Sequence, residues 1–348
     1  MTGMVEPAIE PVVRRVEVAA GVELHIEDLR PAAARPNGPH APNGPNSPPT
    51  VLVHGIAGTT ADWARVAPDL ATARRVIAYD QRGHGASDRA DRRSSYTFDL
   101  LLADLVTLLD ALGLTAVDLV GHSMGGVVAL RCALEHPDRV RSLVLVDTAA
   151  APAAATGPVA RRVVAALLEG AATVAHAVHA AREPVPAADS APAAGVWAAD
   201  RLAADSLAAD RPAAGRADGL AIVDDTAHAV EAGGSVADRQ LAGFDQLDPD
   251  ALVAFGRELG EYPSMVDRLG EIGCPTTVIV GEHDATLRAS AATLARAIPA
   301  GRLAVIVGAD HSPHASRPLA WLAAVDGHFG RLAAPRPPGG PEPVPDQV

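Results

Sequence analysis

The stretch that decides the fold reads Val117-Asp118-Leu119-Val120-Gly121-His122-Ser123-Met124-Gly125-Gly126. Its first four residues predict a short buried strand, and the residues from 123 to 135 predict a helix. Between them stands the pattern Gly-x-Ser-x-Gly. A strand that runs through this pattern into a helix makes a sharp turn, which exposes the serine hydroxyl above the sheet edge. Small residues at 121 and 125 let the neighbouring backbone approach closely, so we predict that Ser123 is a nucleophile.

Short apolar strands alternate with helices on both sides of this turn. Strands are predicted over 51–53, 76–79, 117–120, 143–146, 276–280 and 303–307. Helical character is predicted over 60–74, and helices are predicted over 98–112, 123–135, 289–297 and 315–329. Continuously apolar strands separated by helices indicate a parallel sheet that helices cover on both faces. The predicted fold class is therefore α/β, with a mostly parallel central sheet covered by helices and an inserted helical lid.

Six segments follow from the changes in composition along the chain. They are the N-terminal strands of the core (1–30, with a hairpin over 12–18 and 22–28), a flexible Pro/Asn/Gly-rich loop (31–49), the first part of the core (50–148), an Ala-rich helical insertion (149–265), the second part of the core (266–332) and a disordered Pro-rich tail (333–348). Ligands of parallel sheets bind outside the carboxyl ends of the strands, so an insertion there forms a lid. Helices are expected near 158–181 and 250–260, with a partly disordered linker over 182–215 as the alternative.

Composition excludes several classes of function. The 348 residues carry a net charge of −13, and all 29 basic residues are Arg. An acidic chain without basic clusters disfavours nucleic-acid and anionic-membrane partners. Two cysteines, Cys132 and Cys274, cannot form a disulfide scaffold or a zinc site alone. The sequence shows neither a signal peptide nor an apolar run long enough to span a membrane. We expect a soluble cytoplasmic protein, a monomer or homodimer, that needs no cofactor or metal.

A second glycine-rich stretch, His54-Gly55-Ile56-Ala57-Gly58, follows the strand predicted at 51–53. In folds with this kind of serine turn, a loop after an early strand supplies one backbone N–H to an oxyanion hole, and the residue after the nucleophile supplies the other. The predicted donors are therefore the N–H groups of Ile56 and Met124. Such donors face the oxygen on which negative charge develops during acyl transfer.

A serine hydroxyl needs an adjacent base, and the base needs an orienting acid. In this type of fold the chain order is serine, acid, histidine. The strand at 276–280 is followed by Asp284, and the strand at 303–307 is followed by His311. Both residues lie at strand carboxyl ends and can converge on Ser123. We predict that Asp284 is the acid and that His311 is the base.

Other residues compete for these roles. Asp147 also ends a strand, and Glu282 lies two residues before the predicted acid, so either could replace it. His314 lies three residues after the predicted base and is its competitor. His176 and His179 could share one helix face and bind a metal, but no carboxylate or thiolate partner is evident beside them. We interpret that pair as part of a solvated face.

From His54 to Asp147 the sequence resembles the α/β-hydrolase superfamily, in particular its small esterase-like and C–C hydrolase-like members. The resemblance rests on Asp80-Gln81-Arg82-Gly83-His84-Gly85, on the serine motif with its flanking strands, and on His136-Pro137 followed by Leu143-Val144-Leu145-Val146-Asp147. It supports the same nucleophile, acid and base, and it implies that the 80–88 motif is chiefly structural. Related proteins often carry an acidic residue before a proline after the histidine; here Ser316-Arg317-Pro318 departs from that pattern.

The type of nucleophile narrows the reaction. By the resemblance, relatives that open epoxides or displace halide carry Asp where this chain has Ser123, so acyl transfer is favoured. We expect a serine hydrolase that cleaves a small carboxylic ester, thioester or lactone through an acyl-enzyme intermediate. Alternatives on the same fold are a C–C bond hydrolase, a perhydrolase or an acyltransferase, and a non-catalytic ligand receptor. Aromatic candidates for substrate contacts in the lid are Trp197, Phe244, Phe255 and Tyr262, although local packing is the favoured interpretation for each.

Overall fold

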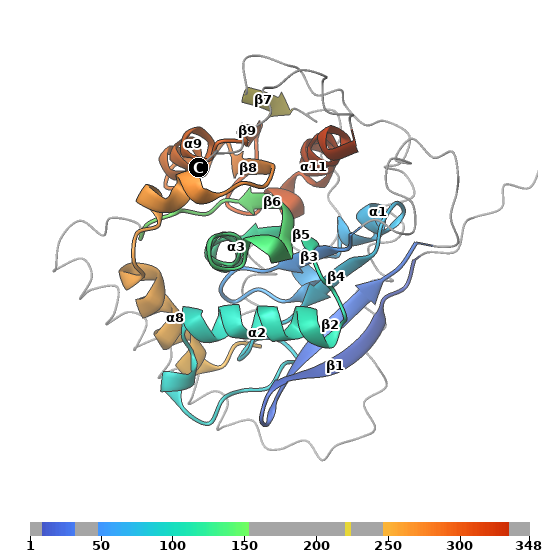
Figure 1. Cartoon of the computed structure of the whole chain (residues 1–348), viewed down its shortest axis with the longest axis vertical. Coiled ribbons are helices and arrows are strands. Elements are labelled where there is room, and N and C mark those ends of the chain that lie inside the picture. The colour runs from blue at the N-terminus through green and yellow to red at the C-terminus, as the bar shows by residue number, and fades with distance from the viewer. Residues whose placement is uncertain (1–8, 32–47, 153–219, 224–245, 334–348) are drawn as a thin grey trace, which may run out of the picture.

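One continuous sheet organises the part of the chain that the structure describes. The computed structural model describes residues 9–31, 48–152, 220–223 and 246–333. The strands are β1 (Val12–Ala19), β2 (Val22–Leu29), β3 (Thr50–Val53), β4 (Val76–Tyr79), β5 (Val117–His122), β6 (Val140–Val146), β7 (Leu220–Val223), β8 (Thr276–Gly281) and β9 (Gly301–Ile306). They lie in the order β1-β2-β4-β3-β5-β6-β8-β9-β7 (Figure 1).

The sheet is mostly parallel, as the sequence predicts. β1 pairs antiparallel with β2, and β2 pairs antiparallel with β4. Every other neighbouring pair among the described strands is parallel. Parallel neighbours place their carboxyl ends at one edge of the sheet, which is where this type of fold binds its ligands.

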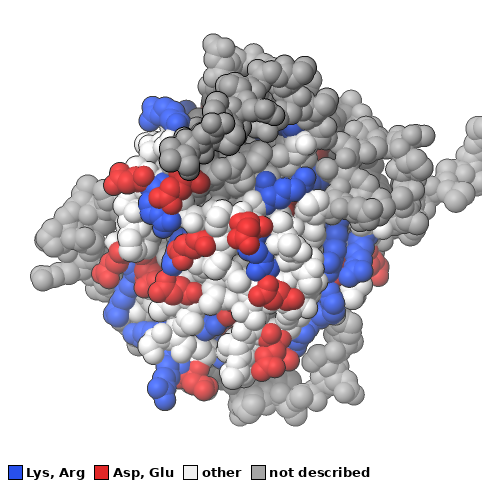
Figure 2. Space-filling view, viewed as in Figure 1, with Lys and Arg blue, Asp and Glu red and all other residues white. Residues whose placement is uncertain are grey.

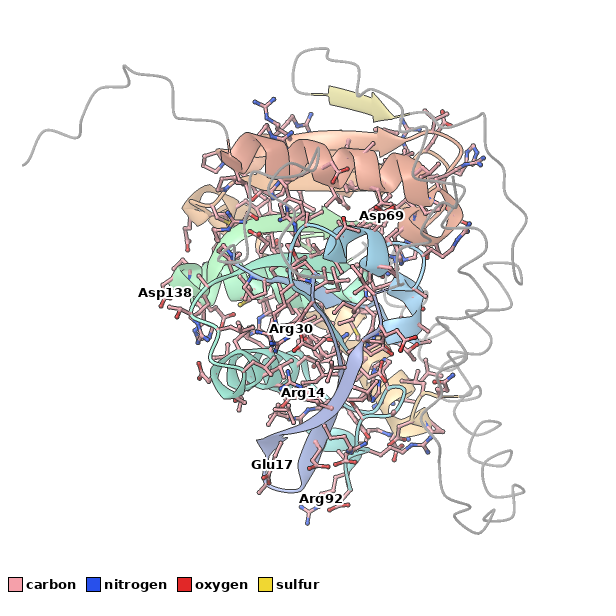
Figure 3. All side chains as sticks on the ribbon, turned by 90° about the vertical axis from the view of Figure 1, so that its right-hand side faces the viewer. Arg14, Glu17, Arg30, Asp69, Arg92 and Asp138 are labelled. Atoms are coloured by element: carbon pink, nitrogen blue, oxygen red, sulfur yellow. The ribbon has the colours of Figure 1, made fainter. Side chains whose placement is uncertain are left out.

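The N-terminal hairpin is confirmed, and an ion cluster fixes its second strand. Gly21 takes a φ of 71° in the turn between β1 and β2, a conformation that glycine adopts without strain. The buried carboxylate of Asp28 near the end of β2 accepts hydrogen bonds from Arg14 (2.7 Å), Arg75 (2.8 Å) and Arg30 (3.0 Å). Figure 3 labels Arg14 and Arg30, which lie near the N-terminal hairpin. Buried charge is tolerated there because several cations surround it.

Helices cover both faces of the sheet. The α-helices are α1 (Ala67–Ala71), α2 (Phe98–Ala111), α3 (Met124–Glu135), α8 (Pro249–Glu261), α9 (Arg288–Ala297), α10 (Pro313–Ser316) and α11 (Pro318–Ala333). Short 3₁₀ turns are η1 (Thr60–Trp63), η2 (Arg93–Ser95), η3 (Pro137–Arg139) and η4 (Val266–Glu271). Buried side chains of α2, α3, α8 and α9 belong to the same core cluster as Leu119 of β5, whereas those of α1 and α11 belong to the second cluster, which contains the next residue, Val120. This alternation follows from the two-residue period of a strand.

Two predicted helical segments are each divided by a proline. The segment with helical character over 60–74 consists of η1 and α1, because Pro68 has no N–H and fits only the first turn of a helix. The helix predicted over 315–329 consists of α10 and α11. Pro318 opens α11, and it disfavours a helical conformation at Arg317, whose φ and ψ are −136° and 62°. The helical character predicted over 60–74 is therefore confirmed in two pieces, whereas the single helix predicted over 315–329 was wrong at Pro318.

Within the predicted insertion 149–265, the described residues are 149–152, 220–223 and 246–265. β7 adds a strand at the sheet edge within this segment, which was predicted to be mostly helical. Its four apolar residues suit either conformation, and pairing with β9 favours the strand. The helix predicted near 250–260 is confirmed as α8. Its Ala251, Leu252 and Phe255 are buried in the same cluster as α2, so this part of the segment packs with the core. The helix predicted near 158–181 and the linker predicted over 182–215 lie outside the described residues.

The described surface carries charges of both signs. Figure 2 shows acidic side chains interspersed with arginines over one face. Some of them pair locally, as Arg131 does with Asp99 at 2.8 Å and Glu135 at 3.0 Å.

None of the helices in the described ranges has the length and apolar character that a bilayer crossing requires.

Candidate active site

The serine predicted as nucleophile lies at the turn between β5 and α3. Ser123 has a φ of 52° and a ψ of −117°, a backbone conformation that non-glycine residues rarely adopt. Its N–H donates to the carbonyl of Val146 at 2.9 Å, and its own carbonyl accepts from the N–H of Gly126 at 2.9 Å. The strain at this position is held by the strand on one side and by the helix on the other. The predicted sharp turn is thus present.

Glycine is required on both sides of Ser123 because backbone atoms approach closely. A Cβ on Gly121 would lie 2.4 Å from the carbonyl oxygen of Gly125. A Cβ on Gly125 would lie 2.3 Å from the carbonyl oxygen of Val53 in β3. Any larger residue would push α3 away from the sheet, and Ser123 would move with it.

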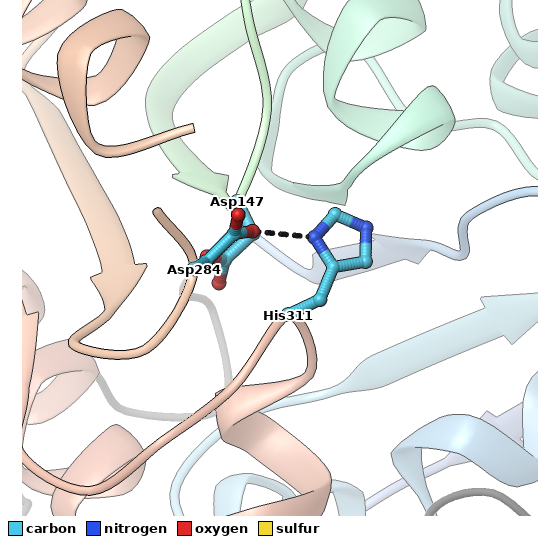
Figure 4. Close-up of side chains that lie close together, drawn as sticks. All are labelled: Asp147, Asp284 and His311. Carbon is cyan, nitrogen blue, oxygen red and sulfur yellow. Dashed lines mark hydrogen bonds and ion pairs between the residues drawn. The ribbon is translucent and has the colours of Figure 1, made fainter. Parts of the chain in front are cut away.

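Three side chains from distant parts of the chain form a hydrogen-bonded row. Ser123 follows β5, Asp284 follows β8 and His311 follows β9. The Nδ1 atom of His311 lies 2.6 Å from Oδ2 of Asp284, and its Nε2 atom lies 3.0 Å from Oγ of Ser123. Figure 4 shows the contact between the acid and the imidazole. With Nδ1–H donating to the acid, Nε2 presents its lone pair to the serine hydroxyl.

The electrostatics favour an ionised acid at Asp284. Burial raises the pKa of this carboxyl, but the hydrogen bond and charge of His311 outweigh burial, and the net pKa lies below the usual range. The N–H of Leu287 also donates to its Oδ1 atom at 3.1 Å. A carboxylate held in this way fixes the tautomer of the histidine and stabilises the imidazolium form.

Asp147 lies beside this row but does not bond to the imidazole. It ends β6 with a φ of 41°, its side chain is fully buried, and its Oδ1 atom accepts from the N–H of Gly281 at 3.0 Å. Burial is the main reason why its pKa rises to about 9; the Gly281 N–H opposes the rise, and the negative charge of Asp284 adds to it. The direct partner of His311 is Asp284, as predicted, and not Asp147.

The same group of side chains also has the spacing of a possible metal site. In the described residues, Asp147, Asp284 and His311 place one carboxylate oxygen each and one ring nitrogen within 4.8 Å of one another. Both ring nitrogens of His311 are already in hydrogen bonds, to the acid and to the serine. The arrangement therefore suits proton transfer better than metal coordination.

The other residues that could have served as acid or base make different contacts. Glu282 accepts from the N–H of Gly308 at 2.9 Å and so closes a turn after β9. His314 is buried, with its ring centroid 4.5 Å from that of Trp63. It is His311, and not His314, that reaches Ser123. His176 and His179 lie outside the described residues.

His122 is a neighbour of the site that sequence reasoning did not assign. Its Nε2–H donates to the backbone carbonyl of His311 at 2.7 Å. Burial is the main reason why its pKa lies well below the usual range, and the nearby His314 and His311 lower it further. A neutral imidazole thus ties the serine turn to the loop that carries the base. The only signal was its place as the variable second residue of Gly-x-Ser-x-Gly, which does not specify a side-chain role.

The predicted oxyanion donors lie on two segments that meet at Ser123. Gly58 N–H donates to the carbonyl of Gly55 at 3.1 Å and tightens the loop that contains Ile56. A Cβ on Gly55 would lie 3.1 Å from Cβ of Ser123, so this loop passes directly beside the nucleophile. Met124 is the first residue of α3, where N–H groups have no partner within the helix. Both segments that carry the predicted donors therefore lie next to Ser123.

With this geometry established, comparison with known proteins identifies the family. A family model described as alpha/beta hydrolase fold matches residues 48–318. The chain belongs to the α/β-hydrolase fold family. The match spans every strand from β3 to β9, together with the three residues of the hydrogen-bonded row.

Relatives of this α/β hydrolase differ in chemistry. The 2-hydroxymuconate semialdehyde hydrolase of Pseudomonas sp. (strain CF600) is 39% identical over 147 residues, 41% of this chain and 46% of that protein. The sn-1-specific diacylglycerol lipase ABHD11 of Xenopus laevis is 39% identical over 107 residues, 30% of this chain and 33% of that protein. The chain thus spans less than half the length of these relatives.

Solved structures agree over much longer stretches. A thermophilic esterase from Thermogutta terrifontis superimposes with a TM-score of 0.63 at 23% identity, covering 93% of this chain and 100% of that one. The enol-lactonase from Burkholderia xenovorans LB400 superimposes with a TM-score of 0.60 at 23% identity, covering 91% and 100%. At this level of identity the likeness shows the fold.

The 80–88 motif of this α/β hydrolase is structural in its contacts. Arg82 forms a buried ion pair with Asp104 of α2. Asp80 accepts from the N–H groups of Thr60 at 2.6 Å and Ala86 at 2.9 Å, which joins two loops beneath the site. His84 is buried and bonded to the Arg82 carbonyl.

The aromatic candidates for substrate contacts divide into two groups. Phe255 and Tyr262 lie in the hydrophobic core, as the packing interpretation expects. Trp197 and Phe244 lie outside the described residues.

Proposed function

We propose that this α/β hydrolase cleaves a small carboxylic ester, thioester or lactone through an acyl-enzyme formed on Ser123. The observation that carries the proposal is the continuous row from Asp284 through His311 to Ser123, with contacts of 2.6 and 3.0 Å. A serine hydroxyl paired with a neutral imidazole nitrogen, itself oriented by a carboxylate, is the arrangement that activates serine for attack on a carbonyl.

Each residue of the row has one part in the reaction. His311 Nε2 takes the proton of the Ser123 hydroxyl as the oxygen attacks the substrate carbonyl carbon. The carbonyl oxygen becomes negatively charged and accepts hydrogen bonds from the N–H groups of Ile56 and Met124. The imidazolium, stabilised by Asp284, then gives its proton to the leaving alcohol or thiol. Water, deprotonated in turn by the histidine, releases the acid product and restores the serine.

Two neighbours keep the base in position. The hydrogen bond that His311 Nδ1–H donates to Asp284 selects the tautomer whose Nε2 is free to accept a proton. The bond from His122 Nε2–H to the His311 carbonyl restrains the backbone that carries the base. Because burial keeps His122 neutral, this restraint adds no positive charge beside the imidazolium that forms.

A fluorophosphonate probe and a panel of substrates test this proposal. The probe should label Ser123, which mass spectrometry of the peptide locates, and labelling should fall in acid as the imidazole is protonated. A panel of p-nitrophenyl esters from acetyl to dodecanoyl, with lactones and a thioester, should then give turnover for at least one class. A folded protein that takes up no label would contradict the proposal and favour a non-catalytic receptor.

A C–C bond hydrolase is the second candidate. Segments of the chain are 39% identical to a 2-hydroxymuconate semialdehyde hydrolase and 47% identical, over 100 residues, to a 2-hydroxy-6-oxo-2,4-heptadienoate hydrolase of Pseudomonas putida. The same row of residues can serve cleavage next to a carbonyl. Faster turnover of a vinylogous diketone than of every ester in the panel would support this candidate instead.

A further inference from the structure

Two carboxyl groups, and not one, lie behind the imidazole of His311. β6 and β8 are parallel neighbours, and the N–H of Asp147 donates to the carbonyl of Ile279 at 2.9 Å. Asp147 follows β6 and Asp284 follows β8, so the two carboxyls emerge side by side at the same edge of the sheet. Figure 4 shows them together, with only one bond to the imidazole. The proposed reaction uses Asp284 and leaves Asp147 without a part.

The position of Asp147 is costly for the fold. A positive φ on a residue other than glycine is strained, although Asp and Asn tolerate it better than most. Its side chain is fully buried, and one oxygen accepts from the N–H of Gly281. The second oxygen, Oδ2, is also buried, and no donor among the described residues reaches it. A buried polar oxygen in such a place calls for a partner.

The charges around Asp147 decide its protonation state. Two ionised carboxylates in contact repel strongly in a buried site, so such a pair tends to share a single proton. Asp284 is the one that stays ionised, because His311 and the Leu287 N–H donate to it. Asp147 faces the carboxylates of Asp284 and Asp310. Burial, opposed by the Gly281 N–H and reinforced by these carboxylates, raises its pKa to about 9.

We propose that Asp147 is a positioning residue: its neutral carboxyl donates a hydrogen bond from Oδ2–H to the carboxylate of Asp284 and holds that carboxylate in line with His311. The inference rests on the proposed function, since it needs Asp284 as the working acid. The bond gives the orphaned Oδ2 oxygen a partner and turns a repulsive pair into an attractive one. The titratable groups facing the pair are His311 beside Asp284 and Asp310 beside Asp147, and the neutral His122 lies next to the imidazole of His311.

Replacement by asparagine, which is uncharged, separates this proposal from a role for Asp147 as an anion. In Asp147→Asn, the amide oxygen can still accept from Gly281 N–H, the amide nitrogen can donate to Asp284, and asparagine tolerates the positive φ. In Asp147→Gly, the donor is lost without backbone strain, because glycine adopts this φ freely. Asp284→Asn is the matched control, since it makes the same chemical change on the neighbouring carboxyl.

The experiment measures kcat, KM and the pH profile of kcat/KM for these variants on one ester substrate. Asp147→Gly should lower kcat about ten- to a hundredfold with little change in KM, the effect of one hydrogen bond to a charged group. Asp147→Asn should keep most of the wild-type kcat. Its kcat/KM should fall at the same acidic pH as that of the wild type. Asp284→Asn should lose about 10⁴-fold in kcat. Infrared difference spectra at pH 7 should show a protonated carboxyl band in the wild type that Asp147→Asn lacks.

Specific outcomes would overturn the inference. If kcat of Asp147→Asn is as low as that of Asp147→Gly, Asp147 acts as an anion. The same conclusion follows if kcat/KM of Asp147→Asn begins to fall only at a lower pH than in the wild type. If the carboxyl band is missing in the wild type, the donor does not exist. Should the glycine variant not fold, as judged by its thermal midpoint, the asparagine profile and the infrared band decide alone. Ser123→Ala is measured alongside to distinguish the two proposals. If this variant kept full activity, the serine mechanism itself would be rejected, and not only the role of Asp147.

Discussion

The Nε2 atom of His311 lies 3.0 Å from the hydroxyl oxygen of Ser123, although 188 residues separate the two in the chain. The contact exists because both residues follow strands of one sheet and because parallel strands end at a common edge. Its formation therefore requires nearly the whole core, from β5 to β9, to be folded. Loss of core packing should abolish activity even when every active-site residue is intact.

Removal of the Ser123 hydroxyl should abolish nearly all catalysis. Ser123→Ala removes the nucleophile but leaves the backbone N–H groups of the oxyanion site. We expect kcat on p-nitrophenyl esters to fall by roughly 10⁶-fold, the scale seen when a serine nucleophile is deleted. Initial-rate assays with extensively purified protein provide the measurement. Turnover equal to the wild type would show that another residue attacks the substrate.

The pH profile of kcat/KM should fall on the acid side. Asp284 keeps its pKa below the usual range, because the bond and charge of His311 outweigh burial, so the acid stays ionised. Loss of activity as the pH falls then reports protonation of the base, which must be neutral to accept the serine proton. His311→Gln should remove the activity. His283→Gln, on an exposed histidine of the same region, is the control and should keep the full profile. Activity retained by His311→Gln would count against His311 as the base.

Asp147 should make the free energy of unfolding depend on pH. Its folded-state pKa is raised, mainly by burial, to about 9, whereas an unfolded aspartate has a pKa of about 3.9. Between these values the folded protein binds a proton that the unfolded chain does not. Stability from this group is therefore full below about pH 4 and is lost as the pH rises towards 9. Urea titrations of wild type and Asp147→Asn across this range should show the difference in unfolding free energy declining with pH. A constant difference would mean that Asp147 is ionised in the fold.

Gly125 should tolerate no side chain. A Cβ there would lie 2.3 Å from the Val53 carbonyl oxygen and 2.4 Å from that of His54, which are backbone atoms that cannot rotate away. Gly125→Ala should lower the free energy of unfolding by about 1–3 kcal/mol or more and displace the serine. Gly260→Ala in α8 is the matched control, since nothing lies within 4 Å of the added Cβ. That variant should be neutral or stabilising by up to about 1 kcal/mol, as alanine favours helices. Equal midpoints for both variants in thermal unfolding would reject the close approach at 125.

Much of the fold could be predicted from the sequence because short residue patterns specify its strands and turns. The Gly-x-Ser-x-Gly stretch between an apolar strand and a helix predicted the turn at Ser123, since only a strand-to-helix junction of this kind needs small residues on both sides. The strands β5, β6, β8 and β9 followed from short continuous apolar runs. The differences lie where a single residue interrupts a pattern, at Pro318, and where pairing with a neighbour decides the conformation, as in β7.

The two residues that form the hydrogen-bonded row with Ser123 could be predicted as an acid and a histidine at strand ends, because chain order in this fold constrains where they stand. The choice between Asp284 and Asp147 is different in kind. Both are aspartates that follow strands, and their local sequences do not rank them. Only the assembled sheet shows that the Asp284 carboxylate reaches the His311 imidazole at 2.6 Å, whereas the Asp147 carboxyl is fully buried and does not bond to that ring.

Residue patterns along the chain were thus enough for the fold class, for the sharp turn at Ser123 and for the strand ends that carry Asp284 and His311, because backbone sterics and strand burial affect only a few neighbouring positions. The bond from His122 to the His311 carbonyl and the pairing of two carboxyls behind the imidazole emerged only in three dimensions. Hydrogen bonding and charge repulsion depend on distances of a few ångströms between atoms that are far apart in sequence, and folding alone sets those distances.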